Sequence, residues 1–147
     1  MQRPKFSDDA GSASLEFITA GVLLLVPLVY LVLAISSVQS ATFAVEGSAR
    51  QAARVFVTSD TADQAYGRAD QAITFGLSDY GLHRDRAQVS VDCLSATCLE
   101  PDSLVTVNVT VNVPLPLVPP VLGLQQLTSV PVTSSSTAHV SRFHGGL

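Results

Sequence analysis

The feature that most constrains this chain is an uncharged apolar segment, residues 17–35, with the sequence FITAGVLLLVPLVYLVLAI. As a helix it would be roughly 28 Å long, which matches the ~30 Å hydrocarbon layer of a bilayer. Its residues are apolar around the whole helix, whereas a helix on a soluble core keeps a polar outer face. The segment therefore predicts one transmembrane helix. Pro27 removes a backbone hydrogen bond within it, so we expect a bend there.

The basic residues on either side of this segment predict its orientation. Arg3 and Lys5 precede it, partly offset by Asp8 and Asp9, and the first basic residue after it is Arg50. Basic residues are retained on the cytoplasmic side of a membrane. We therefore expect a single-pass protein whose N-terminus is cytoplasmic and whose C-terminal domain lies outside the cytoplasm.

The helical pattern continues beyond the apolar segment, which favours one helix from near Ser14 to near Val57. Its second half is predicted to be amphipathic and outside the membrane, because apolar residues recur there at steps of three and four. These residues are Val38, Ala41, Val45, Ala49, Ala52, Ala53 and Phe56.

A second helix is predicted to begin at Thr61, which forms a capping-box pattern with Gln64. It is expected to end between Gly76 and Gly81. Its apolar face consists of Ala62, Ala65, Tyr66, Ala69, Ala72, Ile73 and Leu77. The alanine-rich stripes of the two helices suit close packing of one helix against the other.

After Gly81 the apolar residues alternate with polar ones, which is the period of a β-strand. Three stretches show this pattern: AQVSVDC, SLVTVNVTVNV and SVPVTSSSTAHVSRF. Three antiparallel strands can cover one apolar face with the helices, so the expected fold class is α+β with a small sheet. The proline-rich residues 114–120 separate the last two strands. They predict an extended loop packed on the domain, or one that contacts the membrane or another subunit.

Cys93 and Cys98 lie on either side of the expected turn between the first two strands. Two nearby cysteines outside the cytoplasm usually form a disulfide, which agrees with the predicted orientation. A disulfide that closes such a short loop stabilises the fold by about 2 kcal/mol. A metal site would need more ligands, and a redox pair favours a two-residue spacing.

The sequence contains no recognisable catalytic pattern. His83, His139 and His144 have no metal-binding spacing, and no phosphate-binding loop or nucleophile elbow is present. We expect no enzymatic activity, no cofactor and no metal ion. The formal net charge of −4 gives no reason to expect nucleic acid as a partner.

The residues before the apolar segment, GSASLEF, contain Gly11 followed five positions later by Glu16 and then Phe17. This arrangement resembles the processing site of type IV prepilins, and the Glu-Phe pair is similar to the tight-adherence (Flp) branch. The resemblance implies that residues 1–11 form a leader, which a prepilin peptidase removes by cutting between Gly11 and Ser12. It also implies that Glu16, next to Phe17, pairs with the N-terminal amine of a neighbouring subunit.

The remainder of the chain resembles the TadE-like minor pilins, or pseudopilins, of tight-adherence pili. The resemblance implies a long helix over 12–57, with 17–35 in the bacterial cytoplasmic membrane, and an extracytoplasmic α+β domain over 58–147. The implied partners are prepilin peptidase, other Tad pilins and the inner-membrane assembly platform, in a role in adhesion or secretion. Two alternatives remain open: a membrane-anchored exported binding domain unrelated to pili, and a conventionally secreted protein cleaved near Ser36.

Overall fold

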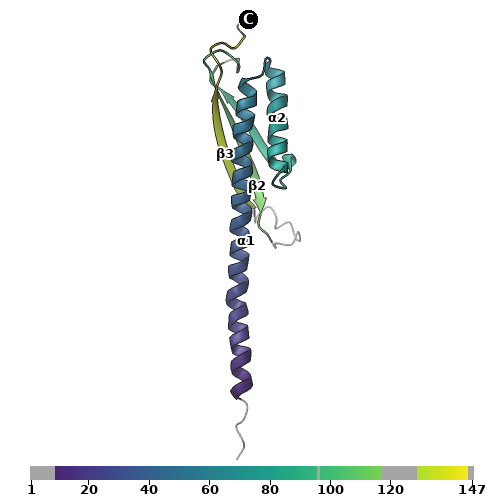
Figure 1. Ribbon diagram of the computed structural model, residues 1–147, viewed down its shortest axis with the longest axis vertical. Coiled ribbons are helices and arrows are strands. Elements are labelled where there is room, and N and C mark those ends of the chain that lie inside the picture. The colour runs from purple at the N-terminus through teal and green to yellow at the C-terminus, as the bar shows by residue number, and fades with distance from the viewer. Residues whose placement is uncertain (1–8, 96, 117–128, 146–147) are drawn as a thin grey trace, which may run out of the picture. The chain divides into compact units, whose positions relative to one another are not determined.

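The computed structural model describes residues 9–95, 97–116 and 129–145 and confirms the α+β class (Figure 1). Two helices, α1 (Asp9–Val57) and α2 (Ala62–Ser78), precede a short 3-10 helix, η1 (Arg84–Arg86). Three strands follow: β1 (Ala87–Cys93), β2 (Leu104–Pro114) and β3 (Ser129–His139). The chain divides into two compact units, Met1–Ile35 and Ser36–Leu147. The folded unit therefore includes the second half of α1 as well as the residues after Val57.

Helix α1 begins earlier than the sequence pattern predicted. It starts at Asp9 rather than near Ser14 and continues through Pro27 to Val57. Alanine, present at positions 10 and 13, has the highest helix propensity of the amino acids. The peptide bond between Gly11 and Ser12 therefore lies in helical backbone, and not in an extended leader.

Within the unit Ser36–Leu147, α2 lies beside α1 and the two helices face the sheet (Figure 1). Most of the predicted alanine-stripe residues are confirmed as buried, because they belong to one cluster with the strand valines; Ala72 is half-buried and lies outside that cluster. The buried helix residues in this cluster are Ala41, Ala44, Val45, Ala49, Ala52, Ala53, Phe56, Val57, Ala65, Ala69, Ile73 and Leu77. Ala62 and Tyr66, expected on the same face, are exposed.

The ends of α2 are set by Thr61 and by the residues after Ser78. The Thr61 hydroxyl accepts a hydrogen bond from the Gln64 N–H, as the capping pattern predicted. After the helix, Gly81 adopts a φ of +69°, and the N–H of Leu82 donates to the carbonyl of Leu77. The helix ends at Ser78, between Gly76 and Gly81 as expected, although Gly76 itself does not form the end. Gly76 lies inside α2, where it faces Ser48 of α1.

The sheet is antiparallel in the order β1-β2-β3, with β2 in the centre. Every second residue of β2 is buried against the helices, because successive side chains of a strand point to opposite faces. These buried residues are Val105, Val107, Val109, Val111 and Val113. The intervening threonines and asparagines form the outer face of the sheet. Of the proline-rich residues 114–120, residues 117–120 lie outside the described part of the chain, as do residues 121–128.

Candidate functional site

The first half of α1 is an apolar helix whose side chains are exposed. It is long and apolar enough to cross a membrane, and none of its most apolar stretch is buried within the structure. Phe17 is 80% exposed and Leu24 is 76% exposed. Such a surface is unfavourable in water and favourable in lipid. By its length and composition, the segment can serve as a single membrane span or as a signal sequence, which share these properties.

The predicted pairing residues lie at the start of this apolar surface. Glu16 and Phe17 are both exposed, and Glu16 forms no hydrogen bond or ion pair with the described residues. Gly11 and Ser12 belong to the same helix, so Ser12 precedes Glu16 by about one turn, or roughly 6 Å along the axis. A carboxylate at the mouth of an apolar helix needs water or a cation to remain ionised at low cost.

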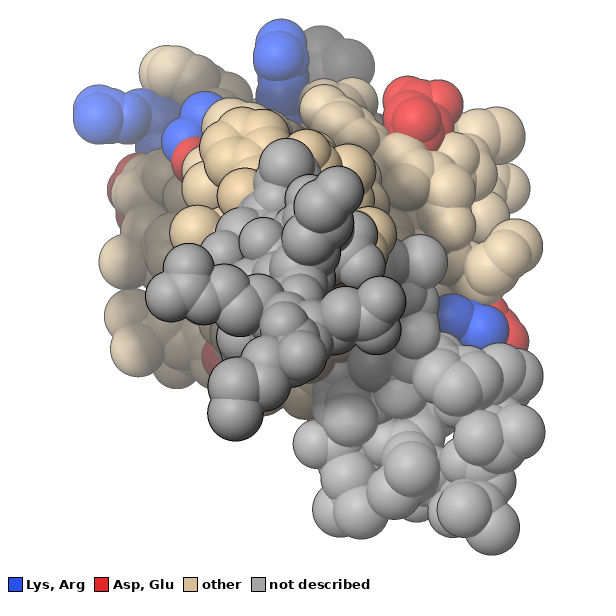
Figure 2. Space-filling view, turned by 90° about the horizontal axis from the view of Figure 1, so that it is seen from below, with Lys and Arg blue, Asp and Glu red and all other residues tan. Residues whose placement is uncertain are grey.

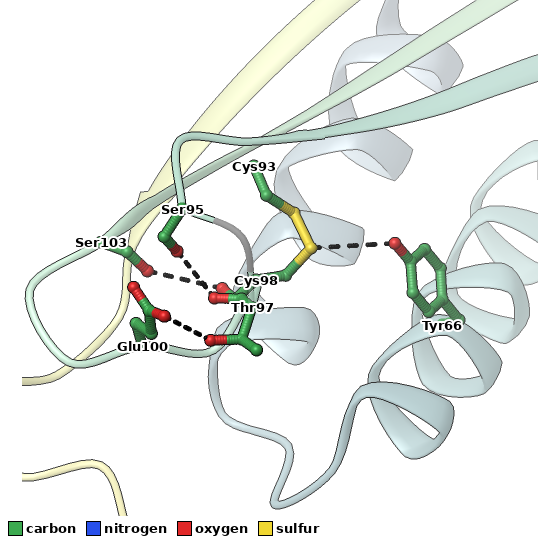
Figure 3. The surroundings of a disulfide bond; sticks show 7 residues. All are labelled: Tyr66, Cys93, Ser95, Thr97, Cys98, Glu100 and Ser103. Atoms are coloured by element: carbon green, nitrogen blue, oxygen red, sulfur yellow. Dashed lines mark hydrogen bonds between the residues drawn. A yellow bond between two sulfur atoms is a disulfide. The ribbon is translucent and has the colours of Figure 1, made fainter.

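The predicted disulfide is present between Cys93, the last residue of β1, and Cys98 (Figure 3). Their Cα atoms lie 5.1 Å apart, and both side chains are half-buried. Ser103 donates a 3.5 Å hydrogen bond to the carbonyl of Cys98 in the same loop. The disulfide thus closes the connection between β1 and β2.

Tyr66 of α2 links this loop to the core, a contact that the sequence did not predict. Its hydroxyl lies 3.8 Å from Sγ of Cys98 (Figure 3). Its ring packs edge-on against Phe56 of α1, with centroids 5.1 Å apart. Tyr66 had been expected to be a buried residue of the helical stripe. Its partner lies 32 positions away in the sequence, so no local pattern signals the contact.

Charged side chains are sparse, and a few of them form ion pairs. Glu46 and Arg50 form an ion pair one turn apart on α1, and Asp70 of α2 binds Arg84 at 2.8 Å. Figure 2 shows one face on which scattered Arg, Asp and Glu side chains lie among uncharged residues. Among the residues that the structure describes, no group of three or more His, Cys, Asp or Glu side chains is placed to hold a metal ion.

Two open hollows lie on the folded unit. One, of about 340 Å³, lies at the end of the sheet and is lined by Asp92, Cys93, Leu94, Leu104, Thr106 and Thr137. The other, of about 280 Å³, lies between α2 and β1 and includes Tyr66, Asp70 and Arg84. Neither lining contains a histidine, and neither pairs a nucleophile with a base, so neither geometry indicates catalysis.

The outer face of the sheet is a ladder of hydroxyl and amide groups. Thr106 bonds to Thr137, and Thr110 bonds to Thr133, each at 2.9 Å between hydroxyl oxygens. On the other side of β2, the Asn108 amide donates to the Asp92 carboxylate at 2.6 Å. The alternation of threonine and asparagine in the sequence predicted a polar face. The pairing between strands follows from the register.

Comparisons with protein-family models, with characterised proteins and with solved structures find no match to this chain. The functional argument therefore rests on the chain's own residues and geometry.

Proposed function

We propose that this chain is a TadE-like minor pilin, or pseudopilin, that acts in the assembly of tight-adherence pili. The observation that carries the proposal is the arrangement of α1. A glycine, a glutamate and an aromatic residue head an exposed apolar helix, which continues without interruption into a folded α+β unit. The alternative, a membrane-anchored binding domain unrelated to pili, accounts for the apolar helix as an anchor. It gives no role to Gly11 and Glu16.

The position of Glu16 supports a role in subunit pairing. Cleavage after Gly11 gives Ser12 a free ammonium group one helical turn before the carboxylate. The new cation and the existing anion then lie at a similar depth in the membrane. Since the structure provides Glu16 with no partner among the described residues, its carboxylate is available to the amine of a neighbouring subunit.

The disulfide supports an extracytoplasmic folded unit. Disulfides persist in oxidising compartments and are rare in the cytoplasm. Cys93 and Cys98 are bonded to each other, and the chain has no other cysteine. This agrees with an N-terminus on the cytoplasmic side, where a prepilin peptidase cuts.

The mature N-terminus of membrane-extracted protein tests the proposal. The chain is produced in cells with an active prepilin peptidase, and its N-terminus is determined by sequencing and intact mass. We expect Ser12. An intact Met1 supports the unrelated membrane-anchored domain, and an N-terminus near Ser37 supports conventional secretion.

Gly11→Val is the matched variant for this experiment. A β-branched side chain at the cut should block the peptidase, so the full-length precursor should accumulate in the membrane. Ser14→Val is the control, because it adds a similar side chain beyond the cut and should still be processed. Normal shortening of Gly11→Val would exclude the prepilin assignment.

A further inference from the structure

We propose that the edge of β3 that no described residue covers pairs, in antiparallel orientation, with the β3 edge of a second copy of this chain. β3 is the last strand of the sheet and is 11 residues long. It pairs with β2 residue by residue, without a bulge, from Ser129 to His139. Natural proteins protect such edges by charges, bulges, prolines or short strands. Between Ser129 and Ala138 this strand has no charged residue, and Pro131 is its one protective feature.

Backbone bonding determines which β3 residues face away from the sheet. The N–H of Val140, just beyond the strand, donates to the carbonyl of Ser103 at 2.9 Å. In an antiparallel strand each residue directs its N–H and C=O to the same side, and the side alternates along the chain. The even-numbered residues therefore bond to β2, and the odd-numbered residues point outward. Pro131 is outward, where its missing N–H costs no bond to β2.

The outward residues in the middle of the edge are Thr133, Ser135 and Thr137. Their side chains are exposed, and no residue in the described ranges bonds to their backbone from outside the sheet. Each of them offers one donor and one acceptor to an incoming strand. This edge is therefore a ready template for strand addition.

The opposite edge of the sheet is protected, which distinguishes it from β3. β1 has seven residues and carries Asp92. The N–H of Leu94 donates to Leu104, so by the same alternation the carbonyl of Ala87 points outward. Arg84 donates a 2.9 Å hydrogen bond to that carbonyl. An incoming strand would have to displace this guanidinium, so β3 is the edge that favours pairing.

The sequence of β3 indicates that the incoming strand belongs to a second copy of this chain. Residues 133–137 read TSSST, which is the same in both directions about Ser135. Two antiparallel copies can therefore pair about a two-fold axis at Ser135, with Thr133 of one facing Thr137 of the other. Threonine pairs of this kind already join β2 to β3 at 2.9 Å. Self-pairing extends that ladder across the axis and brings no like charges together.

The orientation of the pair determines the conditions of the test. Antiparallel pairing reverses the folded unit of the second copy, so the pair forms between copies whose anchors are not held side by side in one bilayer. In detergent each anchor is solvated separately. The experiment therefore uses the full-length protein in detergent, and its result is independent of whether the chain is a pilin.

Cysteine cross-linking tests the axis directly. The native cysteines are bonded to each other, so an introduced cysteine carries the single free thiol. Facing residues of a hydrogen-bonded antiparallel pair have Cα atoms about 5.5 Å apart, which is within disulfide range. Under mild oxidation, Ser135→Cys should give a covalent dimer. Thr133→Cys should not cross-link to itself, because the two positions lie roughly 14 Å apart along the strands.

A mixture of Thr133→Cys and Thr137→Cys should cross-link, since these residues face each other across the axis. In the absence of introduced cysteines, Ser135→Lys should weaken association roughly tenfold, because two ammonium groups meet at the axis. Gln88→Lys, on the outer face of β1, is the control and should associate as the native chain does. A native chain that is monomeric at all concentrations, or equal cross-linking of Thr133→Cys alone and Ser135→Cys, would overturn the proposal.

Discussion

Gly76 shows how one absent side chain sets the distance between two helices. A Cβ added there would lie 2.5 Å from the Ser48 hydroxyl oxygen and 3.4 Å from the Ser48 Cα. Ser48 is buried, and its hydroxyl donates to the carbonyl of Ala44 at 2.6 Å. The hydroxyl cannot move away without losing this bond in the core. Glycine therefore permits an approach of α2 to α1 that no other residue allows.

Gly76→Ala should lower the free energy of unfolding by about 1–3 kcal/mol, because either α2 or Ser48 must move. Gly67→Ala, in the same helix, is the matched control. A Cβ at Gly67 meets no atom within 4 Å, so alanine there should stabilise the helix by about 0.5–1 kcal/mol. Urea unfolding of the two variants, followed by circular dichroism, measures both effects. Shifts of the same sign would contradict this account of Gly76.

At the scale of elements, the layer of helices is joined to the sheet by alanine contacts and by one large aromatic residue. Phe56, in the last turn of α1, is fully buried and packs on Tyr66 of α2. Tyr66 in turn contacts the disulfide between β1 and β2. The end of α1, the start of α2 and the first strand connection therefore meet at one place at the margin of the core.

Phe56→Ala should destabilise the folded unit by about 3–5 kcal/mol, because it leaves a cavity and removes the support of Tyr66. Phe75→Ala is the control on α2, since the Phe75 side chain is 70% exposed. Its substitution should change stability by less than about 0.5 kcal/mol. Thermal unfolding of the full chain in detergent compares the melting temperatures of the two variants with that of the native chain. If Phe56→Ala melts at the native temperature, the packing described around this residue is wrong.

At the scale of the whole molecule, the chain combines a membrane-interacting helix with a folded unit on one continuous α1. The apolar half exposes large side chains that only lipid or other apolar helices can cover. Glu16 stands at the beginning of that surface. A buried ion pair contributes little net stability, yet loss of one partner costs about 3–5 kcal/mol. If the chain is the proposed pilin, pairing through Glu16 would select the register between subunits more than it would raise their affinity.

Glu16→Leu should still insert and still be cleaved after Gly11, because neither step requires the carboxylate. It should not co-purify with other pilin subunits, and pili should be lost. Glu46→Leu is the control, since it removes a glutamate of the same helix within the folded unit, where Glu46 pairs with Arg50. Pull-down measures the co-purification of pilin subunits, and electron microscopy of cells measures piliation. Native piliation of Glu16→Leu would remove this residue from the mechanism.

The sequence by itself determined the elements of this protein. Hydrophobic period is a local property, so the apolar segment, the alanine stripes and the valine alternation predicted two helices and three strands. The cap at Thr61 and the disulfide were also predicted, because each depends on residues only a few positions apart. The start of α1 was placed too late, since helix ends carry a weaker signal than helix interiors.

Only the tertiary structure decided which of these local features meet. Gly76 was interpreted as a helix end because glycine often marks one, yet its role depends on Ser48, which lies on another helix. Tyr66 was predicted to be buried, yet it bridges Phe56 and the disulfide. The exposed edge of β3 depends on strand order and on Arg84 protecting the other edge. The physical reason is that periodicity assigns a residue to a face, whereas its neighbour across that face comes from a distant part of the chain.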